Sequence, residues 1–374
     1  MSPHNGFVVT PWEVRGRVDY EKLVQQFGTS LIDEALLERI RHAFGELHHM
    51  LRRGLFYSHR DFNKILDLFA AGKKFYLYTG RGPSGHTHLG HIVPWVFTRH
   101  LQERFGVPLY FQLTDDEKFL FNDDLELDNT KGYALENALD FIALGFEPRD
   151  TRVIIDTEYI HNLYPIALRV AKRVTFSTAK AVFGFTPSNN IGEIFYTSIQ
   201  AAPCFLEAVK GEKVPSLIPC AIDQDPHFRV ARDVAPLLGY PKTALIHTKL
   251  LPALTGPEEK MAASVPQSAI FTTDDARSAR RKIMNAFTGG AVSVKEQRES
   301  GGNPEVCSVY SYYVYLFESE DTKLKEIERR CRSGEMLCGE CKSDLAERVL
   351  SFLAHHQAMR ERARDHIEDY LLKD

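Results

Sequence analysis

The chain has 374 residues, of which 44% are hydrophobic, and a formal net charge of −4 from 46 Lys plus Arg against 50 Asp plus Glu. This length fits two compact domains of about 150 residues each with a short extra segment, and the charge excludes a global positive field toward nucleic acid. Because no run of about 18 apolar residues or signal-peptide pattern occurs, and the six cysteines are dispersed, we expect a cytoplasmic protein without a membrane segment.

The first 70 residues are expected to form a short N-terminal extension, not a separate domain. An extended start is followed by two stretches with apolar residues at helical spacing, 31–51 and 60–69.

Residues 71–270 are predicted to form a Rossmann-like α/β catalytic domain with a parallel sheet. Short β-branched and aromatic runs alternate with amphipathic stretches of helical length, as in strands joined by crossover helices. The predicted strands are residues 75–78, 107–113, 153–155, 217–222 and 245–247. The predicted helices are residues 89–105, 133–144, 164–183 and 228–238, and Gly106, Gly145, Gly184 and Gly239 stand at or just past their ends, where a left-handed cap is favourable.

Residues 271–374 are predicted to form a helical C-terminal domain. Strand signals end here, and charged amphipathic periodicity covers residues 276–285, 308–317, 323–332 and 345–372.

The glycine-rich stretch from Thr79 to His91, TGRGPSGHTHLGH, follows the first predicted strand and opens the first helix. Its glycines let the backbone turn tightly and approach a ligand, while the free N–H groups of the helix N-terminus favour an anion. The stretch is neither a Walker loop nor a dinucleotide fingerprint. We therefore expect a phosphate site of another kind.

Three histidines lie in this stretch. His88 and His91, three residues apart on the helix, point to one side and can donate to phosphate oxygens, and Gly90 between them leaves room for an adenine ring. A zinc site that adds His86 is the alternative, but no carboxylate or cysteine stands at ligand spacing.

Two short motifs carry a resemblance to a known family. His88-Leu89-Gly90-His91 resembles the His-Ile-Gly-His signature of class I aminoacyl-tRNA synthetases. About 170 residues later, Lys260-Met261-Ala262-Ala263-Ser264 resembles their Lys-Met-Ser-Lys-Ser loop, although Ala262 and Ala263 replace the first serine and second lysine. The role of this loop beyond Lys260 and Ser264 is therefore open.

Longer stretches resemble the tryptophanyl-tRNA synthetases of the archaeal and eukaryotic type, from about residue 73 to the C-terminus. These are LYTGRGPSG, LTDDEKFLF, SIQAAPCF and PCAIDQDPHFRVARD. The sister tyrosyl family typically has Gly-x-Asp-Gln-Arg-Lys where this chain has Asp223-Gln224-Asp225-Pro226. For tryptophan, the resemblance places Tyr78 and Gln112 at the indole N–H, and Glu117, Gln200 and Gln224 at the α-ammonium and carboxylate.

For ATP, the resemblance implies contacts from these residues: Arg81, Gly82, His88, Gly90, His91, Lys118, Lys260, Met261 and Ser264. The residues implied in catalysis are Lys260, His88, His91 and Arg81, which act by positioning and charge neutralisation without a covalent enzyme intermediate. Mg²⁺ is expected with the nucleotide and no protein metal ligands are assigned, because Asp115 and Asp116 are expected to be helix-capping or network carboxylates.

The resemblance also implies partners: L-tryptophan, ATP, tRNA(Trp) and a second copy of the chain in a symmetric homodimer. The helical C-terminal domain would read the anticodon. A basic run, Arg277, Arg280, Arg281 and Lys282, is either a solvated helix face or a contact for tRNA phosphates.

Four cysteines lie in the C-terminal domain. Cys331, Cys338 and Cys341 form a Cys-x6-Cys-x2-Cys set, with Cys307 upstream as a conceivable fourth ligand. Four thiolates suit structural zinc, but only one close pair exists, so reduced thiols or a disulfide are the alternatives.

Two other functions fit parts of the sequence. A nucleotidyltransferase of the same fold explains both motifs but not the helical C-terminal third. A non-enzymatic RNA-binding relative predicts decay at His88, His91 or Lys260, and all three are present.

Overall fold

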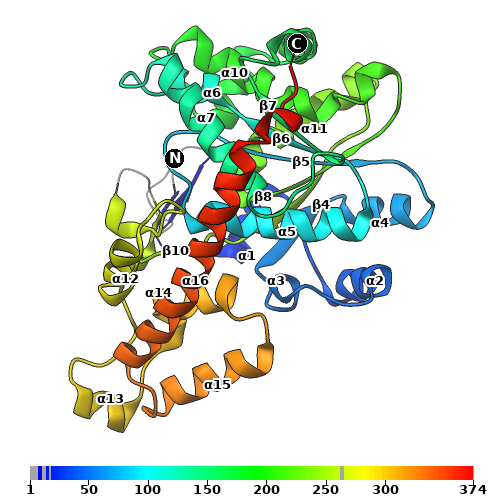
Figure 1. The fold of residues 1–374 in the computed structure, drawn as a ribbon. Helices are drawn as coiled ribbons and strands as arrows, with labels where there is room; N and C mark the ends of the chain where they lie inside the picture. Colours follow the sequence, from blue (N-terminus) through cyan, green and yellow to red (C-terminus); the bar gives the residue numbers. More distant parts are fainter. Residues whose placement is uncertain (1–6, 11–13, 17, 262–264, 374) are drawn as a thin grey trace.

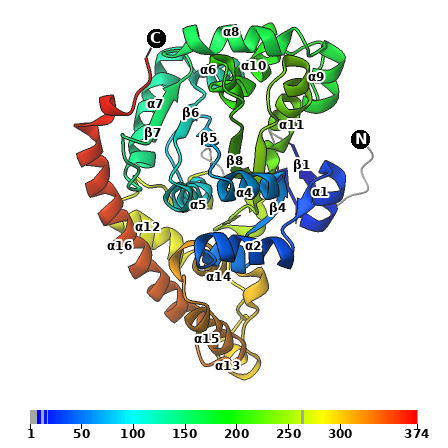
Figure 2. The ribbon, with the colours of Figure 1, turned by 90° about the vertical axis from the view of Figure 1, so that its right-hand side faces the viewer.

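The computed structural model describes residues 7–10, 14–16, 18–261 and 265–373, with only the backbone described at 14, 15, 259 and 260. Within these residues, the main sheet has seven strands in the order β3-β4-β9-β8-β5-β6-β7. Helices cover both of its faces, and the C-terminal helices extend beyond one end (Figures 1 and 2).

The five strands predicted for the catalytic domain are confirmed, and all of them run parallel. They are β5 (Tyr76–Arg81), β6 (Leu109–Leu113), β7 (Thr151–Ile155), β8 (Ser216–Ala221) and β9 (Ala244–Thr248). Their near-continuous apolar composition fits strands that are buried on both faces.

The N-terminal segment contributes two strands to the same sheet, which was not predicted. β4 (Phe56–Arg60) pairs antiparallel with β9, and β3 (Ser30–Leu31) pairs antiparallel with β4. A hairpin of β1 (Val8–Val9) and β2 (Val14–Arg15) lies near β11 (Gly256–Lys260), which pairs with β10 (Pro252–Ala253). The domain boundaries at 70/71 and 270/271 stay predictions.

Successive side chains of a strand point to opposite faces of the sheet, so each strand contributes residues to two hydrophobic cores, one on each face. On β5, Leu77 packs toward one face with α4 (Phe62–Ala70), α5 (Leu89–Phe105) and α7 (Leu127–Ile142). Tyr76 and Tyr78 point to the other face, which is covered by α8 (Ile160–Ala171), α9 (Phe176–Phe183), α10 (Ile191–Ala201) and α11 (Asp225–Val234). This alternation places Tyr78 between the sheet and α10.

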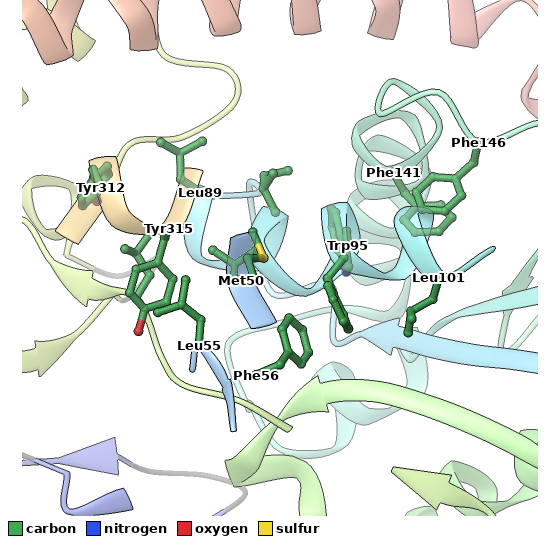
Figure 3. Packing of buried hydrophobic residues seen from close by; sticks show 14 of the residues in the cluster. Met50, Leu55, Phe56, Leu89, Trp95, Leu101, Phe141, Phe146, Tyr312 and Tyr315 are labelled. Atoms are coloured by element: carbon green, nitrogen blue, oxygen red, sulfur yellow. The ribbon is translucent and has the colours of Figure 1, made fainter. Parts of the chain in front are cut away.

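Aromatic rings pack together with aliphatic side chains in the first of these cores, the one that contains Leu77 (Figure 3). The ring of Phe141 stacks on Phe111 with centroids 3.7 Å apart and on Phe146 with centroids 4.0 Å apart. Trp95 of α5 meets Phe111 and Phe141 edge to face. Such pairs hold α5 and α7 in a fixed position on the sheet.

Three predicted helices are interrupted. The stretch 31–51 forms α2 (Glu34–Phe44) and α3 (His49–Arg52), because Gly45 caps α2 in the left-handed region at φ 82°. The stretch 164–183 forms α8 and α9, where the Thr175 hydroxyl accepts the Thr178 N–H at 3.2 Å and starts a new helix. The stretch 228–238 forms the end of α11 and a 3₁₀ turn, Ala235–Leu238. Helices α1 (Tyr20–Phe27), α6 (Asp115–Leu120) and α10 were not predicted.

The C-terminal region is helical as predicted. It contains α12 (Ala276–Met284), α13 (Val294–Ser300), α14 (Ser308–Tyr312) with a π-helical continuation Tyr313–Phe317, α15 (Asp321–Arg332) and α16 (Cys338–Arg364). Helix α16, red in Figure 1, runs from this region back along α12 and α7. No helix in the described part of the chain is long and apolar enough to cross a membrane.

One part of the predicted basic run is not available to a partner. The Lys282 ammonium is buried and donates to both Asp274 oxygens at 2.8 and 2.7 Å, and Arg280 pairs with Glu347. Arg277 and Arg281 remain exposed on α12. Neither alternative, a solvated face or a contact for tRNA phosphates, therefore holds for Lys282, whose ammonium is buried against Asp274.

Candidate active site

The glycine-rich turn lies between the carboxyl end of β5 and the N-terminus of α5, the edge where open parallel sheets bind ligands. Gly82 stands against the start of α6: a Cβ on it would lie 2.1 Å from Lys118 Cε and 2.6 Å from a Glu117 oxygen. A side chain here would displace the Lys118 and Glu117 side chains from these positions. The structure thus brings together Gly82 and Lys118, both predicted to contact ATP.

His88 and His91 lie together at the first turn of α5. Their rings stack with centroids 3.7 Å apart, and the His88 backbone N–H donates to His91 Nδ1 at 3.2 Å. A Cβ on Gly90 would lie 3.0 Å from the His88 ring and 3.1 Å from Met261 Sδ. Met261 therefore reaches the predicted adenine position.

The first turn of α5 is joined by backbone hydrogen bonds to residues 270 and 272, which follow the lysine motif in the chain. The Leu89 N–H donates to the Ile270 carbonyl at 3.0 Å, and the Thr272 N–H donates to the Thr87 carbonyl at 2.9 Å. Lys260 ends β11, but its side chain lies outside the described part of the structure, as do Ala262, Ala263 and Ser264. Their predicted roles stay predictions.

The buried Arg81 side chain supports the glycine-rich turn through hydrogen bonds. Its guanidinium donates to the Thr87 hydroxyl at 2.5 Å, the His86 carbonyl at 3.0 Å and the Gly85 carbonyl at 3.3 Å. Burial lowers its pKa to about 9. The side chain holds the shape of the turn, and its predicted phosphate contact stays a prediction.

The turn is also linked to the C-terminal helix through one carboxylate. Asp140 of α7 accepts a hydrogen bond from the Thr87 hydroxyl and lies 3.0 Å from His356 Nε2 of α16. Arg360 of α16 forms an ion pair with the same carboxylate. Burial raises the pKa of Asp140, but these partners together hold it below its usual value.

The buried side chains of Tyr78 and Gln112 form one hydrogen-bonded group with the half-buried side chain of Gln200. The Tyr78 hydroxyl donates to Gln112 Oε1, and Gln200 Nε2 donates to the Tyr78 oxygen at 3.0 Å and to Gln112 Oε1 at 3.2 Å. Gln200 comes from α10, whereas Tyr78 and Gln112 come from adjacent strands. The hydroxyl of Tyr196, not singled out in the sequence, donates to Gln200 Oε1.

Asp156, also missed in the sequence, orients Gln112. Gln112 Nε2 donates to the Asp156 oxygens at 2.8 and 2.9 Å, so the amide oxygen of Gln112 faces Tyr78. Burial and the neighbouring Asp116 raise the pKa of Asp156 far above its usual value, and burial raises that of Asp116 to about 7. The two carboxyls thus keep a proton between them near neutral pH. The position of Asp156, directly after β7, was the signal that could have found it.

The neighbours of Glu117 favour its ionised carboxylate form. Burial raises its pKa, but the Lys118 ammonium at 2.6 Å and the Thr114 hydroxyl at 2.6 Å together hold it below its usual value. His227 of α11 lies near enough to interact with Glu117, and burial lowers the His227 pKa to about 4. Gln224 lies one turn earlier, at the N-terminus of α11 after β8.

The acidic residues after β6 are not arranged as a metal site. Asp115 accepts the Thr157 N–H at 3.1 Å and its hydroxyl at 2.5 Å, as expected for a network carboxylate. Across the described ranges, no group of three or more His, Cys, Asp or Glu side chains is arranged to hold a metal ion. The alternative of zinc at His86, His88 and His91 therefore has no support in this geometry.

The fold, the glycine-rich turn before α5 and the two sequence motifs are those of a class I aminoacyl-tRNA synthetase. The family model described as "tRNA synthetases class I (W and Y)" matches residues 70–354, and the chain belongs to this family. A tryptophan–tRNA ligase of Pyrobaculum calidifontis is 54% identical over 367 residues, which cover 98% of each chain.

Solved structures agree with this relationship. The crystal structure of Plasmodium falciparum tryptophanyl-tRNA synthetase matches with a TM-score of 0.86 and 40% identity, over 92% of this chain and 94% of that one. The structure of the Encephalitozoon cuniculi tryptophanyl-tRNA synthetase bound to tryptophan matches with a TM-score of 0.86 and 35% identity, over 96% and 99%. These matches favour the tryptophan branch over the tyrosine branch.

Proposed function

We propose that this chain is a tryptophan–tRNA ligase that forms tryptophanyl-adenylate and pyrophosphate from L-tryptophan and ATP, and then transfers the tryptophanyl group to tRNA(Trp). The observation that supports tryptophan as the substrate is the hydrogen-bonded group of Tyr78, Gln112 and Gln200 at the carboxyl edge of the sheet, beside the glycine-rich turn. The near-full-length similarity to tryptophan–tRNA ligases supports the same choice.

The indole N–H is a donor and requires an acceptor. Because Asp156 takes both hydrogen bonds from Gln112 Nε2, the amide oxygen of Gln112 is the atom presented beside Tyr78. Gln112 Oε1 also accepts from Tyr78 and Gln200, so a bound indole N–H would take the place of one of these donors. Phenylalanine has no N–H and cannot make this hydrogen bond, which disfavours it without an editing site.

The α-ammonium and carboxylate of tryptophan are assigned to the polar groups at the strand ends. Glu117 is ionised at neutral pH, because its pKa lies below its usual value, and so supplies a charge-assisted hydrogen bond to the ammonium. Gln200 and Gln224 are proposed to hold the remaining polar atoms.

ATP is proposed to bind along the glycine-rich turn and the first turn of α5. His88 and His91 donate to phosphate oxygens, Gly90 and Met261 border the adenine, and Gly82, Lys118 and Arg81 surround the α-phosphate. Lys260 and Ser264 contact the leaving pyrophosphate. The tryptophan carboxylate attacks the α-phosphorus in line, so the enzyme acts by orientation and charge neutralisation.

Mg²⁺ fits this site as a companion of the nucleotide. The nearby carboxylates already have partners, since Asp115 binds Thr157 and Glu117 binds Thr114 and Lys118. The ion would therefore be held by phosphate oxygens, whose charge it neutralises when bound.

The C-terminal helical region is proposed to bind tRNA, with the exposed Arg277 and Arg281 as candidates for phosphate contacts. Assembly into a homodimer and a cytoplasmic location remain proposals that follow from the family.

The experiment is exchange of labelled pyrophosphate into ATP, run with each of the twenty amino acids, with Mg²⁺ and without tRNA. Exchange with tryptophan alone is expected. Exchange with tyrosine would move the chain to the sister branch, and no exchange with any amino acid would refute the activation step. Tyr78→Phe and Gln112→Ala are then expected to raise the KM for tryptophan and leave that for ATP nearly unchanged.

A further inference from the structure

Tyr196 of α10 lies beside the proposed tryptophan site, although the proposed reaction assigns it no role. The side chain is fully buried, and its ring lies edge to face against Phe121 and His227, with centroids 5.9 and 6.2 Å apart. Its hydroxyl donates to Gln200 Oε1. The neighbouring rings thus hold the tyrosine in place, and its one polar atom is directed at Gln200.

The direction of this hydrogen bond decides how the Gln200 amide is oriented. Burial and the nearby Glu117 carboxylate raise the pKa of Tyr196 well above its usual value, so the hydroxyl keeps its proton near neutral pH. An amide whose oxygen accepts that proton must present its Nε2 on the other side. Gln200 Nε2 accordingly donates to the Tyr78 oxygen at 3.0 Å and to Gln112 Oε1 at 3.2 Å.

The amide of Gln200 makes the hydrogen bond that the proposed function gives to the indole N–H. Gln112 Oε1 accepts from both Tyr78 and Gln200, so one of these donors must make room for a bound indole. Tyr78 is fully buried in β5, and its ring lies edge to face against Phe228 with centroids 5.7 Å apart. Gln200 is half-buried in the last turn of α10 and has the longer, more flexible side chain. Gln200 is therefore the side chain that can yield.

We propose that Tyr196 is a positioning residue of the tryptophan site and acts through Gln200. When the indole N–H takes the acceptor of Gln112, the Gln200 amide turns on its retained hydrogen bond to Tyr196 and presents Nε2 to the substrate carboxylate. Tyr196 itself touches no substrate atom. This inference rests on the proposed tryptophan–tRNA ligase function, in which Gln200 holds a polar atom of the amino acid.

Without the Tyr196 hydroxyl, the Gln200 amide loses its fixed end. Its oxygen would lack a buried donor, which is costly, and the amide could turn over to find another one. A turned amide presents its oxygen, not its Nε2, to the substrate carboxylate. Two acceptors cannot form a hydrogen bond with each other, so tryptophan would bind more weakly.

The first test is Tyr196→Phe, which keeps the ring and removes only the hydroxyl. In pyrophosphate exchange, the KM for tryptophan should rise about five- to tenfold, while the KM for ATP stays within about twofold. The matched control is Tyr76→Phe, which removes an equally buried hydroxyl that donates to the Pro203 carbonyl at 2.8 Å. The control should leave both constants within about twofold, and an equal KM for tryptophan in the two variants would overturn the proposal.

A double-mutant cycle tests whether Tyr196 acts through Gln200. Gln200→Ala is expected to raise the KM for tryptophan, and Tyr196→Phe added to it should raise the KM no further. Effects that multiply in the double variant would overturn the proposal, because Tyr196 would then act independently of Gln200. An unchanged KM for ATP shows that each variant is folded.

Tryptamine, used as a competitive inhibitor of exchange, tests the turn of the amide. It carries the indole and the ammonium of tryptophan but no carboxylate. Gln200→Ala should therefore bind tryptamine at least as tightly as the unaltered enzyme, although it binds tryptophan more weakly. Equal losses for both compounds would overturn the turn of Gln200, and this comparison holds even if Tyr196→Phe does not fold.

These measurements separate the role of Tyr196 from the function on which it rests. No tryptophan-dependent exchange in the unaltered chain would refute the proposed ligase, and the role of Tyr196 with it. Exchange in the unaltered chain with the same KM for tryptophan in Tyr196→Phe would refute the role of Tyr196 alone.

Discussion

Replacement of Asp156 by alanine tests how the tryptophan pocket is organised. The variant removes the acceptor that fixes both hydrogen bonds of Gln112 Nε2, at 2.8 and 2.9 Å. The Gln112 amide can then turn, so that its NH₂ group, not its oxygen, faces the position of the indole N–H. We predict weaker binding of tryptophan although Asp156 itself touches no substrate.

The magnitude follows from the cost of an unpaired buried donor, about 1–3 kcal/mol. At about 1.4 kcal/mol per factor of ten, this corresponds to a loss of roughly 5- to 150-fold in kcat/KM for tryptophan. The loss should lie mainly in the KM for tryptophan, because the ATP residues on α5 keep their positions.

Pyrophosphate exchange at varied tryptophan, and separately at varied ATP, measures both constants. Asp156→Asn is the matched control: it keeps an acceptor for Gln112 and can donate to Asp116 as the protonated acid does, so it should remain within a few-fold of the unaltered enzyme. A KM for tryptophan that changes less than twofold in Asp156→Ala would refute the orienting role.

Three further predictions follow from single contacts. Gly82→Ala should lower kcat/KM for ATP by at least about tenfold, because the added Cβ would meet Lys118 Cε at 2.1 Å; an unchanged exchange rate would contradict the close approach. Arg60→Met should reduce the free energy of unfolding in urea by about 1.5–3 kcal/mol, because buried Asp225 loses the guanidinium at 2.7 Å and keeps His247 Nε2 at 3.1 Å; a loss below about 1 kcal/mol would argue against it. For Asp116, the folded-state pKa of about 7 exceeds the unfolded value, so its contribution to stability is complete below about pH 4 and is lost as pH rises toward 7. Unfolding free energies at several pH values should show this decline in the unaltered protein but less in Asp116→Asn, and parallel profiles would contradict it.

The parallel strands could be predicted because each is a short apolar run, and the first four are each followed by a crossover connection with a helix that has a glycine near its end. β4 could not, because its Ser58 and His59 are polar in sequence but buried in the sheet. Ser58 is satisfied by His247 of β9 at 3.0 Å, a partner 189 residues away. Burial of such polar pairs depends on tertiary pairing that local pattern does not reveal.

In the active site, too, some residues could be predicted from the sequence and others could not. Tyr78 and Gln112 were found through the family resemblance, and the strand register, with Tyr78 opposite Tyr110 and Gly80 opposite Gln112, places them side by side. Asp156 was missed because its link to Gln112 exists only when β7 lies beside β6. Lys282 shows the converse case. Both alternatives for the basic run placed its side chain at the surface, but it is buried against Asp274, and the sequence of the run does not reveal which member turns inward.

The Asp140 carboxylate contacts both Thr87 and the last turns of α16. This contact decides whether a fragment of the enzyme without α16 would keep the structure of the glycine-rich turn. A chain that ended before His356 would leave Asp140 buried without its two cationic or hydrogen-bonding partners from α16, next to the loop that Arg81 supports. Such an uncompensated charge is costly in an apolar interior. The nucleotide-binding turn is therefore expected to depend on the C-terminal helix for its shape, and a minimal catalytic fragment of this protein should include that helix.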